Sequence, residues 1–121
     1  MPRARSKRDR VHQVANWLRD AFPIHGYQII VRVEKISLDG KSRLFGKLVE
    51  SSSDPKVLIL SVDPRDGLGV ILDTTLHEWA HAKCWNETTV EHSREWGIAY
   101  AELLTAWDGG GSKESWEYKY K

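Results

Sequence analysis

The residues with the clearest chemical potential form the stretch His77-Glu78-Trp79-Ala80-His81. Residues four apart in a helix lie on one face, with Cβ atoms about 5–6 Å apart, so two imidazoles at this spacing can bind one zinc ion. Glu78 is rotated by about 100° from His77 around the helix axis, which lets its carboxylate reach a metal-bound water instead of the metal. The spacing predicts one Zn2+ per chain, with Glu78 as the catalytic general base.

A catalytic zinc also needs a third protein ligand and an open position for water. Four downstream residues carry suitable groups: Glu87, Glu91, His92 and Glu95. We prefer His92, because imidazole suits zinc and the preceding segment is long enough to bring it back across the metal. Glu87 occupies the place of the third histidine in HExxHxxGxxH proteases, but Cys84 replaces their glycine and Met1 is the only methionine, so no Met-turn can follow. The glutamates remain alternatives.

Two further roles are expected near this centre. Tyr100, about two helical turns beyond His92, could donate a hydrogen bond to the oxyanion of the tetrahedral intermediate, with core packing as the competing interpretation. The apolar strand residues could hold an extended peptide by backbone pairing if their strand is a sheet edge: Val57, Leu58, Ile59 and Leu60. Cys84 is interpreted as a buried small hydrophobe rather than a ligand.

The metal-binding stretch needs a helix, and the apolar periodicity predicts three of them. The first runs from about Ser6 to Phe22, with Ser6 and Asp9 as its start signal and Pro23 as its end. The second, about Leu68 to Trp85, contains the motif. The third runs from about Ser93 to Trp107; Ser93 is its predicted cap, and the glycines at 109–111 stop it.

Between the first two helices the periodicity changes to that of strands. Alternation over 27–33, a segment over 42–50 with Gly46 as a candidate bulge, and the apolar run 57–62 predict three strands. Their connections are too short for crossover helices, which favours an antiparallel meander. The chain is therefore predicted to be one α+β domain over 1–121, with a small, mostly antiparallel sheet packed against helices, a basic flexible terminus at 1–6 and a tail at 109–121.

Composition excludes several classes of protein. The chain has 121 residues, a net charge of +1 and a single cysteine, so an intramolecular disulfide and a four-cysteine zinc ribbon are ruled out. No apolar run follows the basic amino terminus and none is long enough to span a bilayer, so we expect a cytoplasmic protein without membrane contact. Basic residues crowd the first ten positions and could make a weak nucleic-acid contact, although a solvated terminus is the simpler interpretation: Arg3, Arg5, Lys7, Arg8 and Arg10.

Two segments, Thr75–Ala82 and Glu91–Gly97, resemble the SprT-like metallopeptidases. The resemblance covers about residues 57–107 and implies a zincin-like fold, zinc ligands His77, His81 and His92, and Glu78 as the catalytic carboxylate. Ser93 replaces the usual glycine after the third histidine. The cysteine-rich ribbon of many members and the DNA-binding segments of the Spartan branch are both absent.

The expected function is zinc-dependent hydrolysis of peptide bonds in a flexible or extended protein substrate. One alternative is another metal-dependent hydrolase, such as a deformylase or a nuclease. A deformylase-like site would need a cysteine ligand upstream of the motif, and a nuclease would need basic residues near the metal, for which Lys83 and Arg94 give thin support. The other alternative is a non-proteolytic module in which zinc only joins two helices.

Overall fold

A computed structural model describes residues 6–36, 45–85 and 93–111 of the chain. It begins with helix α1 (Lys7–Ala21), whose first turn is closed by a capping box. The Ser6 hydroxyl accepts a hydrogen bond from the Asp9 amide at 3.1 Å, and the Asp9 carboxylate accepts one from the Ser6 amide at 3.3 Å. The predicted first helix and its start signal are confirmed.

The three strands are β1 (Gln28–Val33), β2 (Gly46–Glu50) and β3 (Val57–Val62), and they form one sheet in the order β1-β3-β2. β2 pairs with β3 antiparallel, as expected for a hairpin, but β1 pairs with β3 in parallel. The predicted meander is therefore wrong, and the sheet is mixed. A parallel pair needs a long crossover, and here the chain between β1 and β3 includes β2 in place of a helix.

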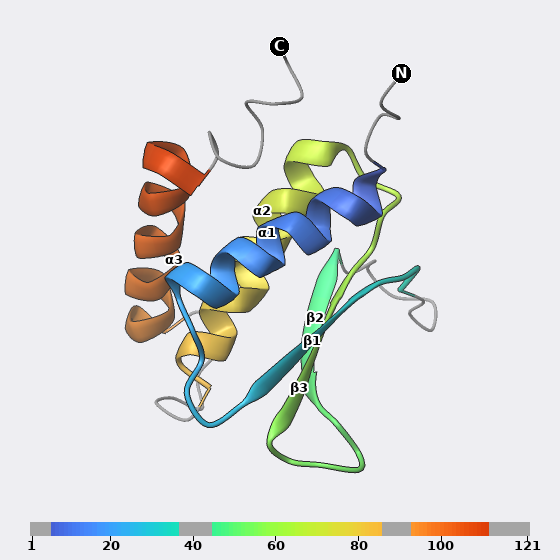
Figure 1. The fold of residues 1–121 in the computed structure, drawn as a ribbon, viewed down its shortest axis with the longest axis vertical. Helices are drawn as coiled ribbons and strands as arrows, with labels where there is room; N and C mark the ends of the chain where they lie inside the picture. The colour runs from blue at the N-terminus through green and yellow to red at the C-terminus, as the bar shows by residue number, and fades with distance from the viewer. Residues whose placement is uncertain (1–5, 37–44, 86–92, 112–121) are drawn as a thin grey trace.

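Helices α2 (Leu68–Lys83) and α3 (Arg94–Ala106) follow, and a π-helical turn, η1 (Trp107–Gly111), continues from α3. Both predicted helices are confirmed; Ser93 caps α3 as expected, although α3 ends before the glycine run. α1 and α2 pack against each other and the sheet, while α3 packs on α2 (Figure 1). None of the helices in the described ranges has the length and apolarity to cross a bilayer.

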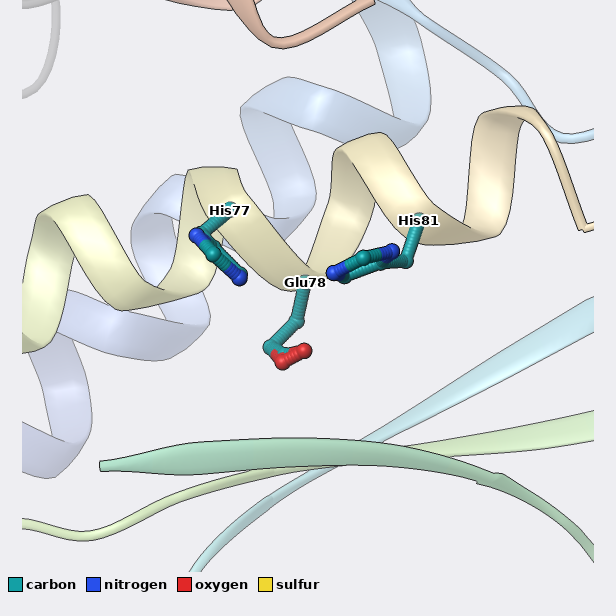
Figure 2. Close-up of side chains that lie close together, drawn as sticks. All are labelled: His77, Glu78 and His81. Atoms are coloured by element: carbon teal, nitrogen blue, oxygen red, sulfur yellow. The ribbon is translucent and has the colours of Figure 1, made fainter. Parts of the chain in front are cut away.

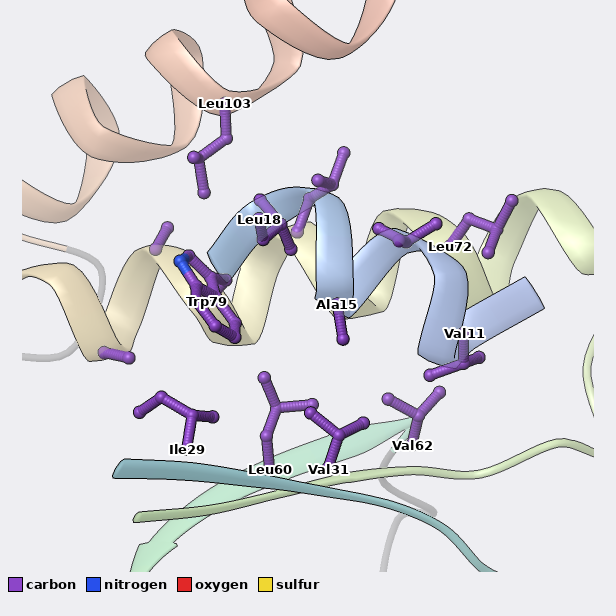
Figure 3. Close-up of a cluster of buried hydrophobic side chains, with 14 of the residues drawn as sticks. Val11, Ala15, Leu18, Ile29, Val31, Leu60, Val62, Leu72, Trp79 and Leu103 are labelled. Atoms are coloured by element: carbon purple, nitrogen blue, oxygen red, sulfur yellow. The ribbon is translucent and has the colours of Figure 1, made fainter. Parts of the chain in front are cut away.

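The core lies between the sheet and these helices, as Figure 3 shows. The inward faces of the strands supply Val31, Leu60 and Val62, and α1 and α2 supply Leu18 and Trp79. The Trp79 side chain is fully buried, and its indole nitrogen donates to the Phe22 carbonyl at 3.0 Å. Burial of each large apolar side chain contributes about 1.5–3 kcal/mol, so this layer fixes the rotation of α2 about its axis.

A buried carboxylate ties the ends of β1 and β3 together before α2 begins. Asp63, 0% exposed, accepts hydrogen bonds from the Ile36 amide at 3.1 Å and from the Arg65 guanidinium at 2.6 Å. The side-chain bonds from Arg65 hold the pKa of Asp63 well below its ordinary value. The connection that leads into α2 is therefore held by a charged group whose bonds are satisfied.

Candidate metal centre

Three groups suited to binding a metal ion meet on α2. The ligand atoms of His77, Glu78 and His81 all lie within 4.8 Å of one another. Figure 2 shows both imidazoles on one side of the helix with the Glu78 carboxylate between them, extending toward β2. The ring centroids of the two histidines are 5.0 Å apart. Two imidazoles one helical turn apart form a donor set that fits a first-row divalent metal ion.

The close approach of β2 to α2 covers Glu78, which is only 7% exposed. Gly46 makes this approach possible: a Cβ atom there would lie 2.5 Å from Thr74 Cγ2, 3.0 Å from the Ser61 carbonyl oxygen and 3.4 Å from Glu78 Cγ. Gly46 pairs regularly with Val62, so its interpretation as a bulge is wrong. The glycine is needed because the helix that bears the histidines lies directly against this strand.

Helix α3 supplies an aromatic wall on another side of the centre. The Trp96 ring stacks on the His81 ring, with centroids 5.3 Å apart and planes 27° apart, and meets the His77 ring edge-on at 4.9 Å. Tyr100 stacks on Trp96 at 5.0 Å and lies 5.8 Å from His77. Tyr100 was expected near this centre, whereas the contact of Trp96 with both histidines was not predicted.

The Tyr100 hydroxyl donates a hydrogen bond to Asp73 Oδ1. Burial, followed by this bond to the carboxylate, raises the pKa of Tyr100 above its ordinary value, so the phenol stays protonated at neutral pH. The role of Tyr100 toward an oxyanion stays a prediction. Asp73 was missed by the sequence analysis, although it lies one helical turn before His77 on the same face of α2.

The remaining predicted site residues have different outcomes. His92, Glu87 and Glu91 lie outside the described residues, so the third ligand stays a prediction. Glu95 is exposed on α3 and does not belong to the metal-binding group that the described residues form. Cys84 is buried, as expected, and its Sγ lies 3.2 Å from the Ala80 carbonyl oxygen.

The expected substrate edge is wrong. β3, which contains Val57, Leu58, Ile59 and Leu60, is the central strand and pairs with a neighbour on each side. Its continuous apolar run reflects this central position, since Leu58 and Leu60 are fully buried. The edge strand beside the metal centre is β2.

The basic amino terminus is described only from residue 6 onward. The Lys7 ammonium donates hydrogen bonds to the carbonyl oxygens of Pro64 at 3.3 Å and Asp66 at 2.8 Å, so it helps to hold α1 to the connection before α2. A nucleic-acid contact through this region stays a prediction.

No family model, curated protein or solved structure matches the chain. The resemblance to SprT-like metallopeptidases therefore rests on the motif residues. What the structure adds is a His-Glu-His group on α2 that is able to bind a metal ion.

Proposed function

We propose that this protein is a zinc-dependent metallopeptidase of the SprT-like type that hydrolyses peptide bonds in protein substrates. The observation that carries the proposal is the convergence of His77, Glu78 and His81 within 4.8 Å on one helix, beside an edge strand. His92 is proposed as the third ligand, since imidazole completes the set that catalytic zinc favours. When bound, zinc would polarise the scissile carbonyl and lower the pKa of a coordinated water to about 7.

The Glu78 carboxylate is the proposed general base. It accepts a proton from the attacking water as the water oxygen bonds to the carbonyl carbon, and it delivers that proton to the amine nitrogen when the carbon–nitrogen bond breaks. Its shielding between α2 and β2 supports this role, because a carboxylate removed from bulk water acts on a nearby proton with less competition from solvent.

The proposed substrate is an extended segment of polypeptide that pairs with β2. Gly46 lies against Thr74 and Glu78 of α2, and Leu48 and Glu50 share its face because side chains alternate along a strand, so a paired peptide would run beside Glu78. At β1, the other edge of the sheet, the Arg19 guanidinium already donates to the Ile29 carbonyl at 2.8 Å. This bond occupies a backbone acceptor of β1, so we place the substrate strand at β2.

The contacts of Lys83 favour peptide hydrolysis over nuclease chemistry. Lys83, two residues after His81, is 3.2 Å from a Glu102 carboxylate oxygen, and its ammonium lies 4.9 Å from the Phe22 ring centroid. A nuclease would need such a charge to hold a phosphate. Lys83 instead joins α2 to α3.

The test compares Glu78→Gln with Glu95→Gln, a matched change at an exposed carboxylate on α3. Each variant is incubated with an unfolded model protein, and its zinc content is measured in parallel. We expect Glu78→Gln to keep its zinc and to lose at least about 10²-fold in cleavage rate, because the amide cannot accept the proton. Glu95→Gln should cleave normally.

Cleavage by Glu78→Gln at the wild-type rate would contradict the proposed mechanism. Zinc binding without cleavage in the wild-type protein would instead favour the non-proteolytic module. Repeating the assay with single-stranded DNA tests the predicted contact of the basic terminus, since the contact predicts a salt-sensitive change in cleavage rate.

A further inference from the structure

The side chain of Trp96, on α3, contacts both histidines of the proposed metal centre. Its ring stacks on His81 at 5.3 Å and meets His77 edge-on at 4.9 Å, and its indole nitrogen donates to the His77 carbonyl at 3.3 Å. The Trp96 amide in turn donates to the Ser93 hydroxyl at 3.2 Å, which is the cap of α3. One side chain therefore contacts both rings from the first turn of the neighbouring helix.

These contacts restrict the rotation of the two imidazoles. A histidine ring turns about two side-chain bonds, and a free ring samples orientations in which neither nitrogen faces the metal. The Trp96 indole lies nearly parallel to His81, at 27°, and crosses His77 at 62°. Trp96 therefore contacts one side of each imidazole, and the two side chains lose less rotational freedom when a metal ion binds.

The hydrogen bond to the His77 carbonyl links the two histidines through the backbone as well. In an α-helix the carbonyl of residue 77 is also the acceptor for the amide of residue 81, four positions on. The indole N–H therefore shares an acceptor with the backbone bond that spans the two histidines. A shift of α3 would disturb the ring contacts and this carbonyl together.

We propose that Trp96 is a positioning residue of the metal centre, which orients both imidazoles and joins the start of α3 to the helix that carries them. The inference rests on the metal centre proposed above. A positioning role of Trp96 can be distinguished from a simple packing role by its effect on metal affinity. Packing alone would alter the stability of the protein, whereas positioning also alters the affinity for metal of protein that remains folded.

The test measures zinc dissociation constants of the full chain by competition with a chelator, well below the unfolding midpoint of each metal-free variant. Trp96→Leu removes the ring contacts and the indole donor, and Trp96→Phe removes only the donor and part of the ring. Trp17→Phe is the matched control, since Trp17 lies on α1 against Phe22 and Trp107. The visible spectrum of the Co2+-loaded protein reports the ligand geometry separately.

We expect Trp96→Leu to bind zinc about 10- to 100-fold more weakly than the wild type, the usual cost of losing a residue that orients metal ligands. Trp96→Phe should lose up to about tenfold, in line with one hydrogen bond, with a shifted Co2+ spectrum. Trp17→Phe should bind zinc normally even if it unfolds at a lower temperature.

Wild-type zinc affinity in Trp96→Leu would overturn the role of Trp96 while leaving the metal centre intact. If that variant does not fold, Trp96→Phe decides, and a wild-type affinity and Co2+ spectrum would overturn the proposal. Failure of the wild-type protein to bind zinc at all would overturn both the metal centre and the role of Trp96.

Discussion

The position of Gly46 allows the approach of β2 to the metal-bearing helix to be tested by adding one methyl group. In Gly46→Ala, the new Cβ atom would lie 2.5 Å from Thr74 Cγ2 and 3.0 Å from the Ser61 carbonyl oxygen. The Ser61 oxygen belongs to the central strand and has little room to move. Thr74 is also held, because its hydroxyl donates to the Val70 carbonyl at 2.7 Å. The strand or the helix must therefore shift.

Crowding of this kind costs about 1–3 kcal/mol, while restriction of the unfolded chain by alanine in place of glycine returns about 0.4–1 kcal/mol. We expect Gly46→Ala to lower the free energy of unfolding by about 1–2 kcal/mol. Adding Thr74→Ser removes the nearer methyl group and keeps the hydroxyl. The double variant should recover most of the loss, with the contact to the Ser61 oxygen remaining.

Urea unfolding of the metal-free protein measures these differences, provided that the denaturant slopes agree between variants. Gly69→Ala is the control, because a Cβ atom there meets nothing within 4 Å and alanine favours a helix. Equal unfolding midpoints for Gly46→Ala and the wild type, or no recovery in the double variant, would refute the close packing of β2 on α2.

Three further predictions address the fold and the site. The pKa of Asp63 is depressed in the folded protein, so its bonds stabilise the protein fully above the unfolded carboxyl pKa of about 3.9, and this contribution is lost as the pH falls below that value. Urea unfolding should therefore show that the free energy of unfolding decreases less between pH 7 and pH 3 in Asp63→Asn than in the wild type. An equal decrease in both proteins would contradict this. Leu60→Ala should lower the free energy of unfolding by about 2–5 kcal/mol, because its side chain is fully buried in the central strand; a loss below about 1 kcal/mol would be inconsistent with that position. If Tyr100 stabilises the oxyanion, Tyr100→Phe should lower kcat by about 10²–10³-fold with zinc retained, whereas an unchanged kcat would assign the phenol to packing.

The helices and the His-Glu-His group could be predicted because both depend on local spacing. The start of α1 at Ser6 is encoded within four residues, and the common face of His77 and His81 follows from helix geometry once α2 is recognised. The periodicity of apolar residues also indicates which face of α2 packs on the sheet, and this packing fixes the helix in place.

The order of the strands could not be predicted in the same way. Alternation in β1 identifies a strand but not its neighbour, and short connections by themselves favour a meander. They permit a parallel pair once β2 becomes part of the crossover. The continuous apolar run of β3 was the available signal for a central strand, since both of its neighbours cover it.

The walls of the site depend on contacts between distant segments. Trp96 and Tyr100 follow helical spacing that equally suits a packed face, and only the docking of α3 on α2 brings them to the histidines. Gly46 likewise has no local signature of its role, because the atoms that exclude a side chain there belong to α2 and β3.

In the proposed metal centre, the imidazoles of His77 and His81 together hold one zinc ion. Equilibrium dialysis against zinc, followed by elemental analysis, should give one tightly bound ion per wild-type chain and none in His77→Ala or His81→Ala. A zinc-free wild-type protein, or full zinc content in either histidine variant, would contradict the claim.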